Sequence, residues 1–209
     1  MKRIIPAIFA VALVLLVLTV SIGLPIYFRP FYYAHIDALE LDVYSGFTKD
    51  QIRTAYDEVL DYLTIPGRPF GTGELAHSTE GAAHFADCKV LFDLNAGVLL
   101  GSALVVIVIL LLRKRCKLPS LRPAAFWAGV SALTLPVVVG SLAALDFDRA
   151  FVIFHHIFSP GKDNWVFDYF ADPIIRVLPQ VFFMNCAILI GAGLILCSCA
   201  LLWLGRKRK

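Results

Sequence analysis

The chain has 209 residues, of which 59% are hydrophobic, and its mean hydropathy is +0.76. Soluble domains are only about half apolar, so this composition excludes an ordinary soluble domain and indicates an integral membrane protein. The formal net charge of +3 is the sum of basic and acidic segments that are well separated along the chain. The basic residues therefore indicate membrane topology, and we expect no nucleic acid partner.

Four segments contain no Asp, Glu, Lys or Arg and are long enough to cross a bilayer, which takes about 20 apolar residues. The first of them is too long for the apolar core of a signal peptide, and no small-x-small cleavage pattern follows it, so we expect it to be retained. The four predicted spans are residues 4–28, 94–112, 124–145 and 181–204.

The charges that flank these spans predict their orientation. Both ends of the chain and the loop between the second and third spans carry eleven basic residues and no acidic one, which places both termini in the cytoplasm. All 16 acidic residues and all five histidines then lie outside. We expect an all-α integral membrane protein, a single membrane domain over residues 1–209, with four transmembrane helices. Its extracytoplasmic, mainly helical cap is formed by the first and third loops, residues 29–93 and 146–180.

Local signals predict helices within the loops. Thr48 and Gln51 have the spacing of a capping box, and the apolar residues after them recur on one helical face. A second helix is expected to begin near Thr79 and either to continue into the second span or to break near Asn95. Phenylalanines at helical spacing predict a third helix over residues 147–158, which Pro160 and Gly161 would end.

Two external histidines from separate loops, His84 and His155, are the candidates for proton transfer, because only histidine has an unperturbed pKa near neutrality. Asp87 shares a helical face with His84, and Asp87 or Asp148 is a candidate to orient an imidazole. The competing interpretation is that each histidine only binds a backbone carbonyl or stacks on a phenylalanine.

Two other sites compete with this histidine pair. Nitrogen and carboxylate ligands suit zinc, but the sequence has no HxxxH or HExxH spacing. Cys88 follows His84 by four residues and is a candidate nucleophile, against its simpler role as a small apolar helix residue. The candidate metal ligands are His84, Asp87, His155, His156 and Asp163.

Several short patterns together resemble the bacterial lipoprotein intramolecular transacylase (Lit) family. The first is His84-x-x-Asp87-x-Lys89, followed by Leu91-Phe92, and the second is Phe154-His155-x-Ile157-Phe158. The remaining matches are Asp163-x-Trp165, Asp168, Asp172, Ile175, Leu178-Pro179 and Phe182-Phe183. The expected arrangement of four spans and an external cap also corresponds to that family.

The resemblance implies an acyltransferase of the bacterial cell membrane. Its substrates would be diacylglyceryl-modified lipoproteins embedded in membrane lipid, and it would move the sn-2 acyl chain to the α-amine of the N-terminal cysteine, giving the lyso form. His84 and His155 would be the catalytic acid and base, with neither cofactor nor metal. The supporting residues would be Asp87, Lys89, Asp163, Trp165 and Asp168. The substrate pocket would be lined by Phe154, Phe158, Phe182 and Phe183.

The alternative is a non-enzymatic transporter or sensor whose external histidines and aspartates bind metal or respond to pH. Transport would favour charged residues within the spans, and the four predicted spans contain none. The oligomeric state does not follow from the sequence.

Overall fold

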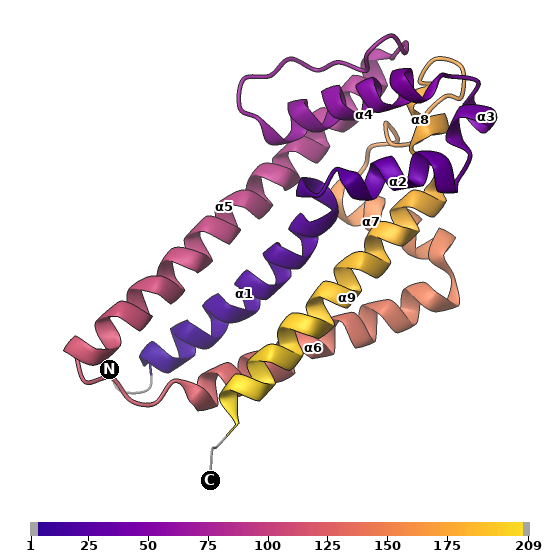
Figure 1. Ribbon diagram of the computed structural model, residues 1–209. Coiled ribbons are helices and arrows are strands. Elements are labelled where there is room, and N and C mark those ends of the chain that lie inside the picture. Colours follow the sequence, from indigo (N-terminus) through magenta and orange to yellow (C-terminus); the bar gives the residue numbers. More distant parts are fainter. Residues whose placement is uncertain (1–3, 207–209) are drawn as a thin grey trace. The chain divides into compact units, whose positions relative to one another are not determined.

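The computed structural model describes residues 4–206, with the side chains of residues 114 and 135 left aside. Within these residues all regular secondary structure is helical, and there is no strand. The helices are α1 (Ile4–Tyr27), α2 (Pro30–Ala38), α3 (Leu41–Ser45), α4 (Lys49–Thr64), α5 (Thr79–Arg115), α6 (Arg122–Leu145), α7 (Phe147–Phe158), α8 (Ile174–Val177) and α9 (Gln180–Gly205), as Figure 1 shows.

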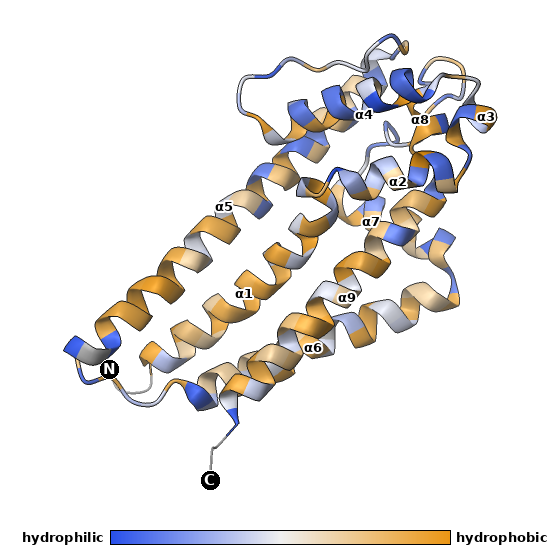
Figure 2. Ribbon diagram, viewed as in Figure 1, coloured by the Kyte–Doolittle hydropathy of each residue, from blue (hydrophilic) through white to orange (hydrophobic). Residues whose placement is uncertain are grey.

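Four of these helices, α1, α5, α6 and α9, are long and apolar enough to cross a membrane, which confirms the expectation of four such helices. In Figure 2 their hydrophobic colouring is nearly unbroken along α1 and over the later part of α5. The first turns of α5 differ, because they carry charged residues from Glu80 to Asp93. We therefore treat the apolar part of α5 from Leu94 onward as its spanning segment.

The chain divides into two compact units. The bundle unit comprises Met1–Leu24, Asn95–Asp146 and Ile188–Lys209. The histidine unit comprises Pro25–Leu94 and Phe147–Ala187, and it contains all five histidines of the chain. The single membrane domain with an extracytoplasmic cap stays a prediction.

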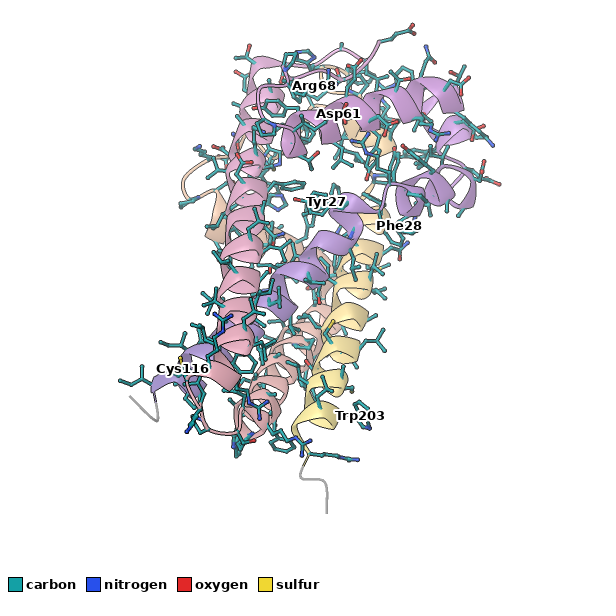
Figure 3. The ribbon with its side chains drawn as sticks, turned by 60° about the vertical axis from the view of Figure 1, so that its left-hand side comes forward. Tyr27, Phe28, Asp61, Arg68, Cys116 and Trp203 are labelled. Carbon is teal, nitrogen blue, oxygen red and sulfur yellow. The ribbon has the colours of Figure 1, made fainter. Side chains whose placement is uncertain are left out.

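Small residues allow the helices of the bundle unit to pack closely, as is common between membrane helices. A Cβ added to Gly129 on α6 would meet the Ser198 carbonyl of α9 at 3.0 Å. Helices α1 and α6 begin, and α5 and α9 end, at one end of this unit (Figure 1), and Arg113, Arg115, Arg122 and Arg206 flank the helix ends there. Figure 3 shows Trp203 projecting outward at this end, which Cys116 shares. An exposed tryptophan there is typical of a membrane interface.

The core of the histidine unit is built around Tyr32, whose side chain is fully buried. Its ring stacks on Tyr56 of α4, with 3.7 Å between the ring centroids and 11° between the planes. Its hydroxyl donates to the Val177 carbonyl of α8 at 2.7 Å. Because a buried hydroxyl must find an acceptor, this bond ties α2 to α8 across the core.

Three of the local predictions are confirmed. The capping box at the start of α4 is present, with Thr48 Oγ1 accepting from the Gln51 backbone and Gln51 Oε1 accepting from Thr48. Helix α7 covers Phe147–Phe158 as the phenylalanine spacing predicted. Helix α5 begins at Thr79 and continues through Asn95 without a break, so the folded-over alternative is excluded.

Candidate active site

His84 on α5 and His155 on α7 lie side by side within the histidine unit. Their ring centroids are 5.8 Å apart, the planes are inclined by 35°, and each residue is only 8% exposed. The sequence predicted that histidines from the two loops would meet, and the fold brings them together. Two buried imidazoles at this distance form a compact site for proton transfer.

Aromatic side chains surround the pair. Trp165 stacks on His155 with 4.5 Å between the centroids, while Phe151 lies 4.4 Å away. Phe167 packs edge-on against His84 at 5.4 Å. These rings keep water from the imidazoles, and the low local dielectric disfavours their charged forms.

The proton of neutral His155 is placed by its own helix. Nδ1 of His155 lies 2.8 Å from the Phe151 carbonyl, one turn earlier on α7. A carbonyl oxygen can only accept, so Nδ1 carries the hydrogen and Nε2 keeps a lone pair. Burial lowers the pKa of His155. The hydrogen bond to the Phe151 carbonyl raises this pKa by a smaller amount, and the charge of His156 lowers it.

His84 has a different environment. Its Nδ1 is buried and has no hydrogen-bond partner, while its Nε2 lies 3.4 Å from Cys88 Sγ. Burial, followed by the neighbouring His155, lowers the pKa of His84 to about 4, with Asp87 acting in the opposite direction. Both histidines of the pair are therefore neutral at pH 7, and Nδ1 of His84 has no hydrogen-bond partner among the described residues.

Cys88 is held in the thiol form. Burial and the charge of Asp87 raise its pKa to about 12. A thiolate is the nucleophilic form of cysteine, so this environment disfavours the Cys88 nucleophile. The protonated thiol lies 3.4 Å from His84 Nε2, where a thiol is a weak donor and a weak acceptor and the His84 tautomer decides which group donates.

The carboxylates considered as imidazole partners bind other groups. Asp87 accepts from Lys162 Nζ at 2.6 Å and from Asn164 Nδ2 at 3.1 Å, and these bonds lower its pKa. Asp148 accepts from Gln180 Nε2 at 2.5 Å. In the structure neither carboxylate orients an imidazole through a hydrogen bond.

The remaining predicted supporting residues serve the surrounding backbone. Lys89 donates to the Tyr62 carbonyl at 2.6 Å. Asp168 accepts from the Phe170 and Ala171 backbones at 2.8 Å each, which closes a turn. Asp163 is exposed, and its carbonyl accepts from the Val166 backbone at 3.0 Å.

The four predicted pocket phenylalanines divide into two groups. Phe154 packs edge-on against His155 at 5.5 Å, and Phe158 packs on Phe154 at 4.7 Å, both rings being about half exposed. Phe182 is buried in the core beside Tyr32. Phe183 lies between these groups, in contact with Phe182 and Phe151.

A metal centre finds no support in the part of the chain that the structure describes, residues 4–206. No three His, Cys, Asp or Glu side chains there are grouped to hold a metal ion. In particular, His156 is exposed and packs edge-on against Trp165 at 6.0 Å.

Sequence reasoning did not assign site roles to four residues that line or brace this site. Phe151 precedes His155 by four residues, so helical spacing alone predicts that contact. Phe167, Lys162 and Asn164 lie in a connection without regular structure, and no local pattern predicts their partners on α5.

Comparison with known proteins identifies the family. The family model described as "Lipoprotein intramolecular transacylase Lit" matches residues 7–183. The in meso structure of the membrane integral lipoprotein intramolecular transacylase Lit from Bacillus cereus is similar to this chain at 25% identity and a TM-score of 0.89, covering 98% of this chain and 94% of its own. No curated protein matches.

Two further structures of the Bacillus cereus protein, in which a histidine is replaced by arginine or by alanine, are also similar. Each is 25% identical, with a TM-score of 0.82 over 99% of this chain, and covers 91% and 92% of its own length, respectively. The helical fold and the family match agree, and together they describe a multi-pass membrane enzyme. The chain belongs to the lipoprotein intramolecular transacylase Lit family and is an acyltransferase.

Proposed function

We propose that the protein moves the sn-2 acyl chain of a diacylglyceryl-modified lipoprotein to the α-amine of its N-terminal cysteine, with His84 and His155 as the catalytic pair. The observation that carries this proposal is the close packing of two buried imidazoles, 5.8 Å apart, in an aromatic setting. Membership of an acyltransferase family argues against the alternative of a non-enzymatic transporter or sensor.

His155 is the general base. Its Nδ1 hydrogen is engaged by the Phe151 carbonyl, and Nε2 keeps the lone pair. As the α-amine attacks the ester carbonyl, Nε2 takes one amine proton, and a carbon–nitrogen bond forms. When the tetrahedral intermediate collapses, the ester carbon–oxygen bond breaks and the imidazolium returns that proton to the glyceryl alkoxide. The proton lost by nitrogen is gained by oxygen, so the step needs no co-reactant.

His84 stabilises the oxyanion of that intermediate. We assign the Cys88 thiol as the donor in its 3.4 Å contact with His84 Nε2, and with that assignment the hydrogen of neutral His84 lies on Nδ1, the buried atom without a partner. A fixed N–H donor in a dry site is worth more than one in water and costs no reorganisation during the reaction. The low pKa of His84 keeps it neutral, so it donates a hydrogen bond without competing for the proton.

The aromatic surroundings explain how an intramolecular transfer is accelerated. The substrate must fold so that its amine reaches its own ester, through a path of nitrogen, two cysteine carbons, sulfur, two glyceryl carbons, oxygen and the acyl carbon. Holding reactants in such a geometry lowers the barrier by converting a rare conformation into the bound one. The half-exposed Phe154 and Phe158 provide an apolar surface beside His155 for the acyl chain.

The active site faces the extracytoplasmic side. Both ends of the chain and the loop between the second and third spans carry the basic residues, so the positive-inside rule assigns them to the cytoplasm, and the loops that carry His84 and His155 then lie outside. Substrate lipoproteins carry their modified cysteine on the outer face of the membrane, where this orientation makes the site accessible.

The test is the lipid structure of the product. Mass spectrometry of an N-terminal lipopeptide incubated with the purified protein in lipid should detect an amide-linked acyl chain and a free glyceryl hydroxyl. His84→Ala and His155→Ala should both lose this product while remaining folded in the membrane. His156→Ala is the matched control, because His156 is adjacent but exposed, and it should keep activity. An acyl chain that stays on glycerol with the wild-type protein would refute the proposal.

A further inference from the structure

Asp87 joins α5 to the loop that follows α7. Lys162 Nζ donates to Oδ1 of Asp87 at 2.6 Å, and Asn164 Nδ2 donates to Oδ2 at 3.1 Å. One carboxylate thus holds two side chains of the loop, one on each oxygen. Asp87 lies three residues after His84, about one turn along the same helix.

The same loop carries the ring that packs on His155. Trp165 is the residue after Asn164, and its Nε1 donates to the Lys162 carbonyl at 3.1 Å. Its indole stacks on His155 with 22° between the ring planes. A displacement of Lys162 and Asn164 therefore displaces the indole, and with it the face against which His155 packs.

We propose that Asp87 is a positioning residue, which acts through Lys162 and Asn164 to hold Trp165 against His155 and so sets the geometry of the histidine pair. The inference rests on the proposed function, since it assigns a task to the same site. It also explains why Asp87 bonds to neither imidazole although it lies one turn from His84.

We call the two hydrogen bonds from Lys162 and Asn164 to Asp87 the Asp87 clasp. Breaking this clasp should affect folding and catalysis by different amounts. The side chains of Lys162 and Asp87 are 52% and 29% exposed, and an exposed ion pair contributes little to the stability of the fold. A displacement of about 1 Å at a catalytic group, by contrast, lowers a rate by up to about 100-fold. Breaking the clasp should therefore reduce turnover strongly while changing stability little, which a purely structural ion pair would not do.

The first experiment separates kcat from KM. Asp87→Ala and Lys162→Ala should each lower kcat by roughly tenfold or more, with KM and the melting temperature nearly unchanged. The charge-swapped double variant, Asp87→Lys with Lys162→Asp, should recover most of that loss. Lys49 and Asp37 form another exposed ion pair in the histidine unit, so Lys49→Ala is the matched control and should keep wild-type kcat.

The second experiment measures Trp165 without any turnover. In a Trp127→Phe/Trp203→Phe background Trp165 is the sole tryptophan, since the chain has three. Adding Asp87→Ala should raise the acrylamide quenching of its fluorescence, and the charge swap should lower it again. Because this readout needs no substrate, it distinguishes failure of the clasp from failure of the proposed reaction.

Three results would overturn the inference. One is wild-type kcat in Asp87→Ala. Another is a loss of kcat with unchanged Trp165 quenching, because Asp87 would then act on His84 or on the substrate directly. The third is a charge swap that restores neither kcat nor quenching in a folded protein.

Discussion

Nδ1 of His155 lies 2.8 Å from the carbonyl oxygen of Phe151, one turn earlier on the same helix. This hydrogen bond places the proton of the neutral ring on Nδ1 and leaves Nε2 basic. A base of this kind needs no carboxylate partner, which agrees with the engagement of Asp87 and Asp148 by other groups.

The pH dependence of kcat/KM should show two acidic limbs. Protonation of the free substrate amine, which has a pKa of about 7.7–8.0, produces the first limb. Along this limb log(kcat/KM) falls by one for each pH unit. His155 produces the second, and since burial lowers its pKa, the slope should steepen to two only below about pH 6.5. A slope of two that begins above pH 6.5 would contradict the lowered pKa of His155.

Thermal stability should fall as the pH drops from about 6.5 to about 4. The pKa of His84 is about 4 in the folded protein, so the unfolded chain binds more protons over this interval and acid favours unfolding. Melting temperatures measured across these pH values should show a smaller decline in His84→Gln than in the wild type. Equal declines in both proteins would show that His84 does not contribute to the acid sensitivity.

Asparagine should partly replace His84 but not His155. The Nδ2 group of asparagine is a hydrogen-bond donor near the position of an imidazole Nδ1, so His84→Asn keeps an oxyanion donor that His84→Ala lacks. We expect His84→Asn to retain at least tenfold more kcat than His84→Ala, since one such donor is worth about 10²–10³ in kcat. His155→Asn should be as inactive as His155→Ala, because an amide is not a base. If His155→Asn kept activity and His84→Asn lost it, the roles of general base and oxyanion donor would be exchanged between the two histidines.

Cys88→Ala should retain product formation. Its thiol pKa of about 12 leaves almost no thiolate at neutral pH, so an acyl-enzyme on sulfur is not expected. The variant loses only the weak contact with His84 Nε2, and we expect kcat to fall by less than about tenfold, the equivalent of 1.4 kcal/mol. Complete inactivity of a folded Cys88→Ala protein, together with an acyl adduct on wild-type Cys88, would instead identify Cys88 as the nucleophile.

Gly81→Ala should destabilise the protein and lower its activity. A Cβ at this position would lie 2.3 Å from Asp172 Oδ1 and 3.1 Å from the ring of Phe167, which packs on His84. Buried Asp172 accepts from the Ser78 backbone and hydroxyl at 2.7 Å each, so it cannot move without breaking these bonds at the start of α5. Overpacking of this kind costs about 1–3 kcal/mol, which a thermal or denaturant unfolding experiment would detect.

Gly97→Ala on the same helix is the control for that substitution. An added Cβ there meets nothing within 4 Å. Alanine is the better helix former, so Gly97→Ala should leave the melting temperature unchanged or raise it. Equal destabilisation by both substitutions would point to a general effect on α5 and not to the contact with Asp172.

The sequence determined the features that depend on nearby residues. Charge-free runs of about 20 residues indicated the four apolar helices, because only a helix satisfies its own backbone in lipid. The capping box at Thr48 and the helix over Phe147–Phe158 depend on neighbours three or four residues apart, and the structure has both. The histidines and their chemistry followed from residue type and from the family resemblance.

The tertiary structure alone decided which partners these residues have. It placed Phe182 in the core, where its ring packs on Tyr32 and His35, and it paired Asp87 with Lys162 of the loop after α7. Hydrophobic burial is not directional, so a sequence pattern shows that a phenylalanine is buried without showing against what. The contact between His84 and His155 likewise joins segments far apart along the chain, and only the packing of α5 against the α7 region brings the two rings to 5.8 Å.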